Sequence, residues 1–313
     1  MVTVSPPSTL TDSALTIAIR AQLTADPNLD QLRVVGAWGN QALRNLSLPH
    51  LLGLEMADAS LGRLWFEGAC SKLHLQDLRV AGGTGTAVKI LSKDTGAPCE
   101  ISFDGARVNG TGMVRALSVQ RWLWADGVER PSTWPTNLSF TDCEFFGSAG
   151  DVTSVYGGRN VAFRRCLMRD PVISASTVDH IDLLQVTHCV PSGAGVVPGY
   201  EFPVGLLVEE CRMGASKLPA RWGGPHQGII LSGTSSAPGG GNINGVVLRG
   251  NQIGRNDRGG VCWPGTGIII ASPDTRNVVC YGNPITAAAG GCIVMADAGP
   301  NIVDYACPFD AHD

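Results

Sequence analysis

The stretch that decides the fold is residues 160–168, NVAFRRCLM, because its pattern recurs four more times along the chain. Val161 and Phe163 are apolar residues two positions apart, Cys166 follows three positions later, and a further apolar residue completes the frame. The other copies are residues 137–145 (NLSFTDCEF), 205–213 (GLLVEECRM), 245–253 (GVVLRGNQI) and 277–285 (NVVCYGNPI). We call the residue at the Cys166 position the anchor; the five anchors are Cys143, Cys166, Cys211, Asn251 and Asn283. A repeat of this kind fixes the architecture and is interpreted before any single element.

Looser copies extend the repeat, with anchors at Ala57, Leu78, Ala106 and Cys189. From Ala57 onward, successive anchors are 21, 28, 37, 23, 23, 22, 40 and 32 residues apart. A minimal unit of 21–23 residues, enlarged in places by insertions, is typical of a parallel β-helix with three short strands in each coil. Alternate apolar residues would fill the lumen, and the 40 glycines would permit tight corners.

We therefore predict an all-β fold, a single-stranded right-handed parallel β-helix (a solenoid) of about nine or ten coils with a short N-terminal α-helical cap. We expect residues 1–31 to form an N-terminal segment with the capping helix, 32–295 the β-helix, and 296–313 a C-terminal cap or tail. A β-sandwich is the alternative, which the scarcity of Asn-Gly turns disfavours. A leucine-rich repeat would need a regular leucine spacing that this sequence lacks.

Residues 12–25, DSALTIAIRAQLTA, give the one strong helix pattern in the sequence. Leu15, Ile19 and Leu23 fall on one face at helical spacing, and Thr11 is a candidate N-cap. Because a solenoid needs its open end covered, we expect this helix to be a cap. A helix that binds a membrane or a partner is the alternative.

The ten cysteines are better explained by the repeat than by disulfides. Cys143, Cys166, Cys189 and Cys211 would occupy one position in consecutive coils, about 4.8 Å apart with parallel side chains, whereas a disulfide needs converging ones. We expect a buried ladder of reduced thiols, continued by side-chain amides at Asn251 and Asn283; a disulfide or metal site is the alternative. No CxxC spacing occurs, so we expect neither a metal nor a cofactor.

Tryptophans concentrate in the segments that interrupt the repeat. Those segments hold Trp122, Trp124 and Trp134, then Trp222 with His226, and finally Trp263. An indole has a flat apolar face and a polar edge, which suits stacking on sugar rings and also protein interfaces. We predict that these residues bind substrate; the alternative is that they pin their own loops or contact other subunits.

Residues 177–186, TVDHIDLLQV, form a second candidate site. If Ile181 and Leu183 point inward, His180 and Asp182 point outward about 7 Å apart, with Asp179 adjacent. Asp151 in the preceding coil would approach them. Such carboxylates could act as acid and base on a glycosidic bond, or bind a cation for β-elimination. The alternative is a solvated polar strand face.

The coils NVAFRRCLM, GVVLRGNQI and NVVCYGNPI resemble the right-handed β-helix proteins of the pectin-lyase-like class, over about residues 50–290. That class includes polysaccharide lyases, glycosidases, and the tailspike or head-spike proteins of phages and gene-transfer particles. The stretch DHIDLLQ is also similar to a His-x-Asp-x-x-Gln stretch of some members. We map no catalytic arginine or calcium-binding aspartates of pectate lyases onto this sequence, which disfavours lyase activity.

The net charge and the hydropathy of the sequence exclude some classes of binding partner. A net charge of −4 and a pI near 5.9 argue against nucleic acid, and no apolar stretch approaches the roughly 18 residues of a membrane span. The opening residues, MVTVSPPSTLTDS, lack the regions of a secretory signal. We therefore expect synthesis in a bacterial cytoplasm and display on a virion or phage-like particle, with a secreted protein as the alternative.

The function that we expect is that of a spike or adhesin subunit binding a bacterial capsular polysaccharide. Its partners would be the polysaccharide, identical subunits in a homo-oligomer, and other structural proteins of the particle. One alternative is a polysaccharide lyase or glycoside hydrolase that uses Asp179, His180 and Asp182. Another is a purely structural particle component.

Overall fold

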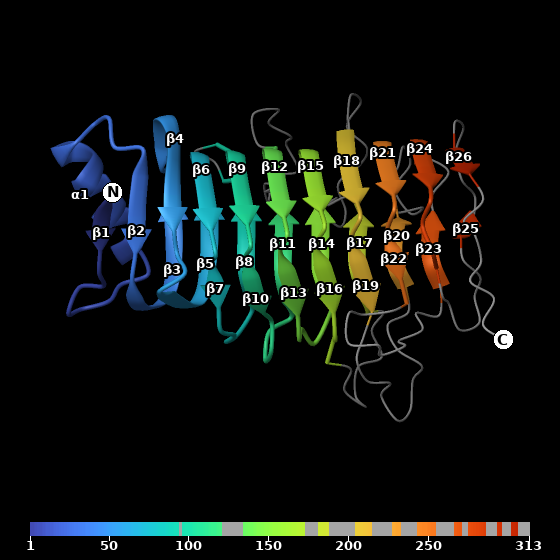
Figure 1. The fold of residues 1–313 in the computed structure, drawn as a ribbon, viewed down its shortest axis with the longest axis horizontal. Coiled ribbons are helices and arrows are strands. Elements are labelled where there is room, and N and C mark those ends of the chain that lie inside the picture. Colours follow the sequence, from blue (N-terminus) through green and yellow to red (C-terminus); the bar gives the residue numbers. More distant parts are fainter. Residues whose placement is uncertain are drawn as a thin grey trace, which may run out of the picture.

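The computed structural model describes residues 1–93, 96–120, 134–172, 181–187, 204–214, 227–232, 243–254, 266–270, 275–285, 293–295 and 302–305. Its strands stack into three walls of parallel strands, and Figure 1 shows the coils following one another from the N-terminal to the C-terminal end. The fold is the predicted single-stranded right-handed parallel β-helix, the hand that connections between parallel strands adopt. Within the described residues wall C has nine strands, in agreement with the nine or ten coils expected.

Along most of the chain, successive strands belong to walls A, B and C in turn, and we define each wall by its strands. Wall A contains β1 (Val2–Val4), β2 (Gln31–Val34), β4 (Ser47–Glu55), β6 (Ser71–Gln76), β9 (Cys99–Asp104), β12 (Thr136–Thr141), β15 (Arg159–Arg164), β18 (Val204–Glu209), β21 (Asn244–Arg249), β24 (Arg276–Tyr281) and β26 (Ile302–Tyr305). Wall B contains β7 (Arg79–Val80), β10 (Arg107–Asn109), β13 (Glu144–Phe146), β16 (Leu167–Arg169), β19 (Arg212–Gly214) and β22 (Gln252–Ile253). Wall C contains β8 (Thr86–Leu91), β11 (Arg115–Gln120), β14 (Thr153–Tyr156), β17 (Asp182–Thr187), β20 (Gln227–Ser232), β23 (Thr266–Ile270) and β25 (Ile293–Met295), together with the long strands β3 (Gly36–Arg44) and β5 (Ala59–Glu67). Strand β5 pairs with β7 and with β8 and so joins walls B and C into one sheet.

The sequence repeat is the repeat of the coils. Val161 lies in register between Leu138 and Leu206, the first apolar residues of the neighbouring copies, as the frame predicts. The rings of Phe140 and Phe163 stack with centroids 4.9 Å apart, and all five side chains are buried in the lumen. Each buried ring contributes roughly 1.5–3 kcal/mol of hydrophobic stabilisation, so the stacked apolar ladders hold the coils together.

A left-handed residue stands directly before each anchor and turns the chain from wall A to wall B. The φ angle is 53° at Asp142 and 59° at Gly282, in the region that L-residues other than glycine and asparagine rarely occupy. The same conformation is found at Asp77, Gly105, Arg165, Glu210 and Gly250. The backbone conformation at this corner is thus the same in each coil. The residue at the corner is either glycine or a residue that adopts the left-handed conformation at a cost in energy.

The anchors form the expected buried ladder. Cys143, Cys166 and Cys211 are free thiols, and burial raises the pKa of Cys166 well above its ordinary value, which the adjoining Cys143 and Cys211 reinforce. Further along, Asn251 Nδ2 donates to Asn283 Oδ1 at 2.9 Å, so the predicted amide ladder is confirmed. The thiols therefore pack as small buried apolar groups that also donate weak hydrogen bonds to backbone carbonyls.

Two of the looser anchors are wrong. Ala57 is exposed and Met56 is buried instead, because a tight turn in which Ala59 N donates to Met56 O brings the methionine inward. Cys189 anchors no coil of its own, because β15 pairs directly with β18, which makes the stretch from Cys166 to Cys211 a single long coil. Cys189 itself lies outside the described residues.

Helix α1 (Ala14–Ala25) covers the N-terminal end as predicted (Figure 1), with Leu15 and Ile19 fully buried. Its N-cap is Ser13 rather than Thr11, and Ser13 makes no side-chain capping bond. The wall A sheet begins earlier than the expected boundary at residue 32, because β1 already pairs with β2.

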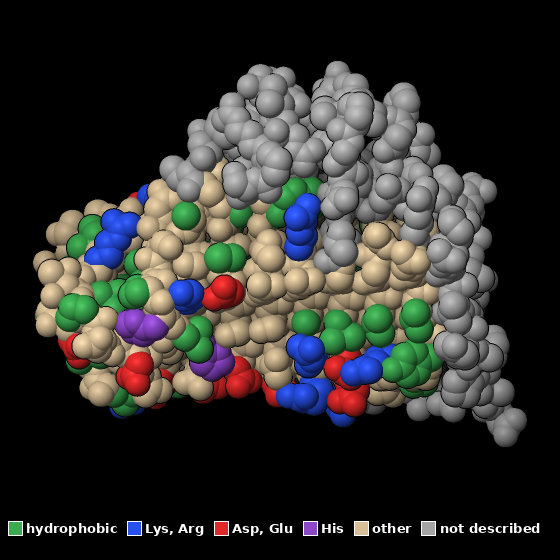
Figure 2. Space-filling view, turned by 90° about the horizontal axis from the view of Figure 1, so that it is seen from above, with side chains coloured by type: hydrophobic (Ala, Val, Ile, Leu, Met, Phe, Trp, Pro, Cys, Tyr) green, Lys and Arg blue, Asp and Glu red, His purple; other side chains and the backbone are tan. Residues whose placement is uncertain are grey.

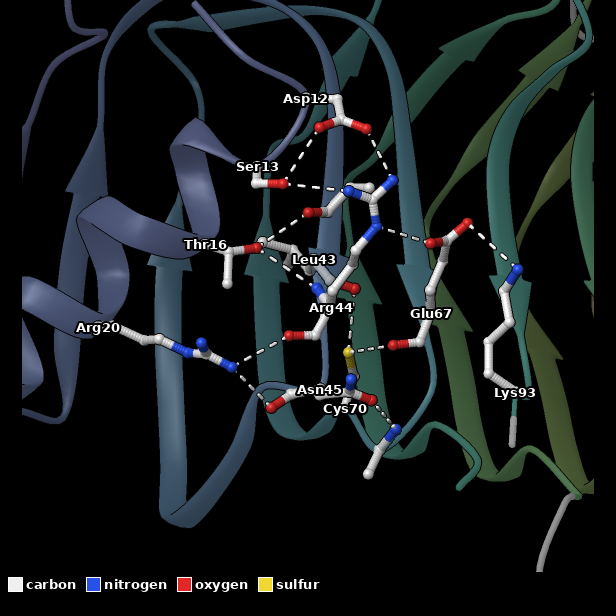
Figure 3. Close-up of polar contacts among 12 residues, drawn as sticks. Asp12, Ser13, Thr16, Arg20, Leu43, Arg44, Asn45, Glu67, Cys70 and Lys93 are labelled. Atoms are coloured by element: carbon white, nitrogen blue, oxygen red, sulfur yellow. Dashed lines mark hydrogen bonds and ion pairs between the residues drawn. The ribbon is translucent and has the colours of Figure 1, made fainter. Parts of the chain in front are cut away.

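Polar contacts fasten α1 to the first coils, as Figure 3 shows. Thr16 Oγ1 donates to Ala42 O at 2.9 Å, and Arg20 reaches the carbonyl of Arg44 at 3.2 Å. Arg44 in turn bridges Asp12 at 2.7 Å and Glu67 at 2.8 Å. The cap is therefore held by side-chain hydrogen bonds as well as by its buried apolar face.

Candidate functional site

Wall C presents a continuous row of outward side chains, because alternate residues of its strands point into the lumen. We call this set the wall C row; it consists of Trp65, Lys89, Ser118, Ser154 and Gln185, each in register with the next. A second outward row two residues along each strand consists of Glu67, Leu91, Gln120 and Tyr156. The wall thus carries polar and aromatic groups at one coil spacing. Ser118, Ser154 and Leu91 are buried, and the other members of the two rows are half-buried.

Five side chains from three coils form a hydrogen-bonded cluster on this wall, which we call the Arg115 cluster. Arg115 Nε donates to Ser154 Oγ at 2.8 Å, and its Nη2 donates to Tyr156 OH at 2.6 Å. The Tyr156 hydroxyl in turn donates to Gln185 Oε1 at 2.6 Å. Arg115 also pairs with Asp151 at 3.3 Å, so a guanidinium, a phenol and an amide are fixed relative to one another.

Asp151 holds Arg115 of the cluster in place through a hydrogen bond. Its side chain is buried, Oδ2 accepts from Arg115, and Oδ1 accepts from the Asp182 backbone N–H at 3.2 Å. Burial raises the pKa of Tyr156, Arg115 opposes this shift, and the negative charge of Asp151 adds to it. The phenol therefore stays neutral at physiological pH and can both donate and accept a hydrogen bond.

The predicted approach of Asp151 to Asp182 is found, but Asp182 does not point into solvent. Asp182 is fully buried and follows the alternation of Leu184 and Val186, which face the lumen. Which residues of this strand face the lumen could not be predicted from the residue types, because Leu183 is also buried and apolar residues therefore occupy both faces of the strand. Asp179 and His180, the other members of the predicted acid–base set, lie outside the described residues.

Of the predicted sugar-binding residues, only Trp134 falls in the described chain. Its side chain is just 6% exposed, and the Arg159 guanidinium lies 5.3 Å from its ring centre. This placement fits the alternative of an indole packed on the solenoid wall. The remaining members of the set lie outside the described residues: Trp122, Trp124, Trp222, His226 and Trp263.

A shallow groove of about 630 Å³ lies on the outer face of wall A. Its floor includes Ala162, Leu207 and Val247, and an ion-pair network of Arg164, Glu209 and Arg249 runs along one edge. Figure 2 shows a row of hydrophobic side chains beside a group of basic and acidic side chains. These ion pairs join side chains of neighbouring coils. An aliphatic floor with neutralised charges offers few hydrogen bonds, so wall C is the stronger candidate for a polar ligand.

No group of three or more metal-ligating side chains occurs among the residues that the structure describes. In the same part of the chain, no helix is long and apolar enough to cross a membrane.

The sequence analysis named Asp151 and quoted the stretch DHIDLLQ, which ends at Gln185, but it missed Arg115, Ser154 and Tyr156. Arg115 precedes Asp151 by 36 residues, so only the register of the coils brings the two together. The anchors alone do not reveal this contact, because Ser154 lies 11 residues after Cys143 whereas Gln185 lies 19 residues after Cys166. The strand register pairs the two residues.

Comparison with known proteins gives structural matches alone, because no family model and no curated protein matches the sequence. PfbA, a surface adhesin of Streptococcus pneumoniae, matches with a TM-score of 0.45 and 10% identity over 96% of this chain and 91% of that one. The pectate lyase Pel9A matches with a TM-score of 0.39 and 10% identity, over 96% of this chain and 78% of that one. The tailspike protein of the E. coli bacteriophage HK620, in complex with a pentasaccharide, matches with a TM-score of 0.36 and 12% identity. The match covers 97% of this chain and 64% of that one. The expected likeness to pectin-lyase-like proteins is therefore found, but at these TM-scores no residue role or ligand is transferred.

Proposed function

We propose that this chain is a spike or adhesin subunit of a phage-like particle, and that it binds a bacterial capsular polysaccharide along wall C without cleaving it. The observation that carries the proposal is the Arg115 cluster, which fixes a guanidinium, a phenol and an amide from successive coils. Sugar hydroxyls both donate and accept hydrogen bonds, and a few polar groups held in fixed geometry recognise them. A polymer of similar units would meet similar positions on successive coils.

The carboxylates next to this surface favour binding over cleavage. A general acid or base must reach the glycosidic oxygen or the attacking water. Asp151 is 4% exposed and its two oxygens accept hydrogen bonds from Arg115 and from the Asp182 backbone, while Asp182 is fully buried. Both carboxylates are therefore suited to positioning their neighbours.

An enzyme that uses Asp179, His180 and Asp182 is the second candidate, favoured by the closeness of Asp182 to the Arg115 cluster. The test is incubation with purified capsular polysaccharides, measuring both retention of the polymer on immobilised protein and its chain length. The proposal predicts retention without shortening. Shortening would establish the enzyme, and neither retention nor shortening would leave a structural component of the particle.

The proposal includes a homo-oligomer at an extracellular or particle surface. Flat solenoid walls allow identical subunits to pack side by side under closed symmetry. Sedimentation equilibrium at micromolar concentration should give an oligomer mass; a monomer would remove this part of the proposal.

A further inference from the structure

Two cations converge on one indole at the N-terminal end of the wall C row. The guanidinium carbon of Arg63 lies 4.2 Å from the centre of the Trp65 ring, and Lys89 Nζ lies 5.3 Å from the same centre. Trp65 Nε1 donates to Thr86 O at 2.9 Å, which holds the indole against the wall. The electron-rich ring face attracts both cations, so the ring fixes where they stand.

The nearby acids are bound to other cations. On the same strand as Arg63, Glu67 pairs with Arg44 at 2.8 Å and with Lys93 at 4.0 Å. Asp12 also pairs with Arg44, which lowers the pKa of its carboxyl, and Figure 3 shows both acids held in this way. No ion pair or hydrogen bond joins the Arg63 side chain to any residue of the described chain. Arg63 contributes to the lowered pKa of Asp12 through its charge, but it is not hydrogen-bonded to that carboxylate, so its N–H donors are not used by it.

We propose that Arg63, Trp65 and Lys89 form a subsite for an acidic sugar, whose carboxylate or sulfate binds the two cations. A planar guanidinium stacked on an indole keeps its N–H donors at its edge, where they match the two oxygens of a carboxylate. The lysine adds a point charge on the same ring. Local charge governs such binding, so the net charge of −4 for the whole chain does not oppose it.

The subsite adjoins the Arg115 cluster, so the inference rests on the proposed function and narrows the ligand to an acidic polysaccharide. Thr86, whose carbonyl accepts the Trp65 hydrogen bond, pairs in register with Arg115 one coil further on. Trp65 and Ser154 are separated by three coils, and at about 4.8 Å for each coil the distance between them along the solenoid is roughly 14 Å. A chain of several sugars would therefore span both places, with its charge at Arg63 and its hydroxyls at Tyr156.

The subsite is tested apart from the polymer with monosaccharides. Titrating ¹⁵N-labelled protein with glucuronate should shift the Arg63 Nε–Hε NMR signal, assigned by its loss in Arg63→Lys, whereas glucose should not shift it. The signal of Arg165, which is bound to Asp142 on another corner, is the internal control. A glucuronate effect that is absent, or equal at Arg165, would overturn the subsite.

The polymer arm uses hyaluronate, chondroitin sulfate and neutral dextran of matched length on immobilised protein. We expect retention of the acidic polymers, falling about fivefold or more in Arg63→Gln and in Lys89→Gln. The matched controls Arg165→Gln and Lys72→Gln, on other faces, should keep wild-type retention. Equal loss in the controls, or dextran bound as well as hyaluronate, would refute the acidic specificity. A shift with glucuronate but no retention of any polymer, capsular polymers included, would instead refute the proposed function and leave the anion site standing.

Discussion

The amide ladder at the anchors makes the most direct prediction about how the solenoid is held together. Asn251 is fully buried, and its side chain makes three hydrogen bonds between coils. Nδ2 donates to Val208 O at 2.9 Å and to Asn283 Oδ1 at 2.9 Å, and Oδ1 accepts from the Cys211 N–H at 3.0 Å. The perturbation is Asn251→Ala, which removes all three without changing a surface group.

The expected loss follows from these contacts. A hydrogen bond contributes about 0.5–1.5 kcal/mol net, and a buried partner left unsatisfied costs about 1–3 kcal/mol. Three bonds lost together, with the Cys211 N–H left buried and unpaired, should lower the free energy of unfolding by about 3–5 kcal/mol. Asn251→Cys should cost about 1–3 kcal/mol, because a thiol restores one of the donors. Cys166 Sγ already donates to Phe140 O at 3.3 Å in the equivalent place.

Urea unfolding followed by far-ultraviolet circular dichroism measures these values. The exposed Asn28 provides the matched control, and Asn28→Ala should change stability by less than about 0.5 kcal/mol. The reasoning is refuted if Asn251→Ala costs under about 1 kcal/mol, or if the cysteine variant is as unstable as the alanine variant.

Three further predictions concern the corner, the indoles and the thiols. Gly282 has φ 59° with no atom within 4 Å of an added Cβ, so Gly282→Ala should cost about 1–2 kcal/mol of unfolding free energy in urea; no loss would contradict the left-handed corner. Alanine at Trp122, Trp124 or Trp222 should weaken polysaccharide retention by about five- to hundredfold at an unchanged melting temperature, whereas Trp134→Ala should lower the melting temperature and spare retention; the reverse pattern would exchange their roles. Iodoacetamide at pH 8, followed by mass spectrometry, should label the half-buried Cys99 before Cys166, whose burial raises the pKa of its thiol; equal labelling would show that the ladder is open.

The fold could be predicted because each coil repeats one constraint. Val161, Phe163 and Cys166 face a closed lumen, so the same residue types must recur in every copy and the frame is visible without a structure. The Asn251–Asn283 contact follows from the same logic, since a buried amide needs a partner one coil away.

The site was less predictable, because outward residues have no lumen to constrain them. Arg115 and Asp151 meet only through the register of two coils separated by a long connection. Asp182 was placed on the wrong face because Leu183 and Leu184 are both buried, and a strand buried on both faces shows no alternation. Cys189 was counted as an anchor because its spacing fits, although β15 pairs directly with β18.

The measurement that tests the central claim most directly is the affinity for a capsular oligosaccharide of a matched pair of tyrosine variants. Tyr156 lies in the Arg115 cluster on wall C, whereas Tyr281, 37% exposed, contacts Arg249 on wall A at 3.1 Å. By isothermal titration calorimetry, Tyr156→Phe should bind about three- to tenfold more weakly than wild type, because one hydroxyl and its hydrogen bonds are lost. Tyr281→Phe should bind as wild type does. Equal affinities for the two variants, or a loss confined to Tyr281→Phe, would contradict the assignment of binding to wall C.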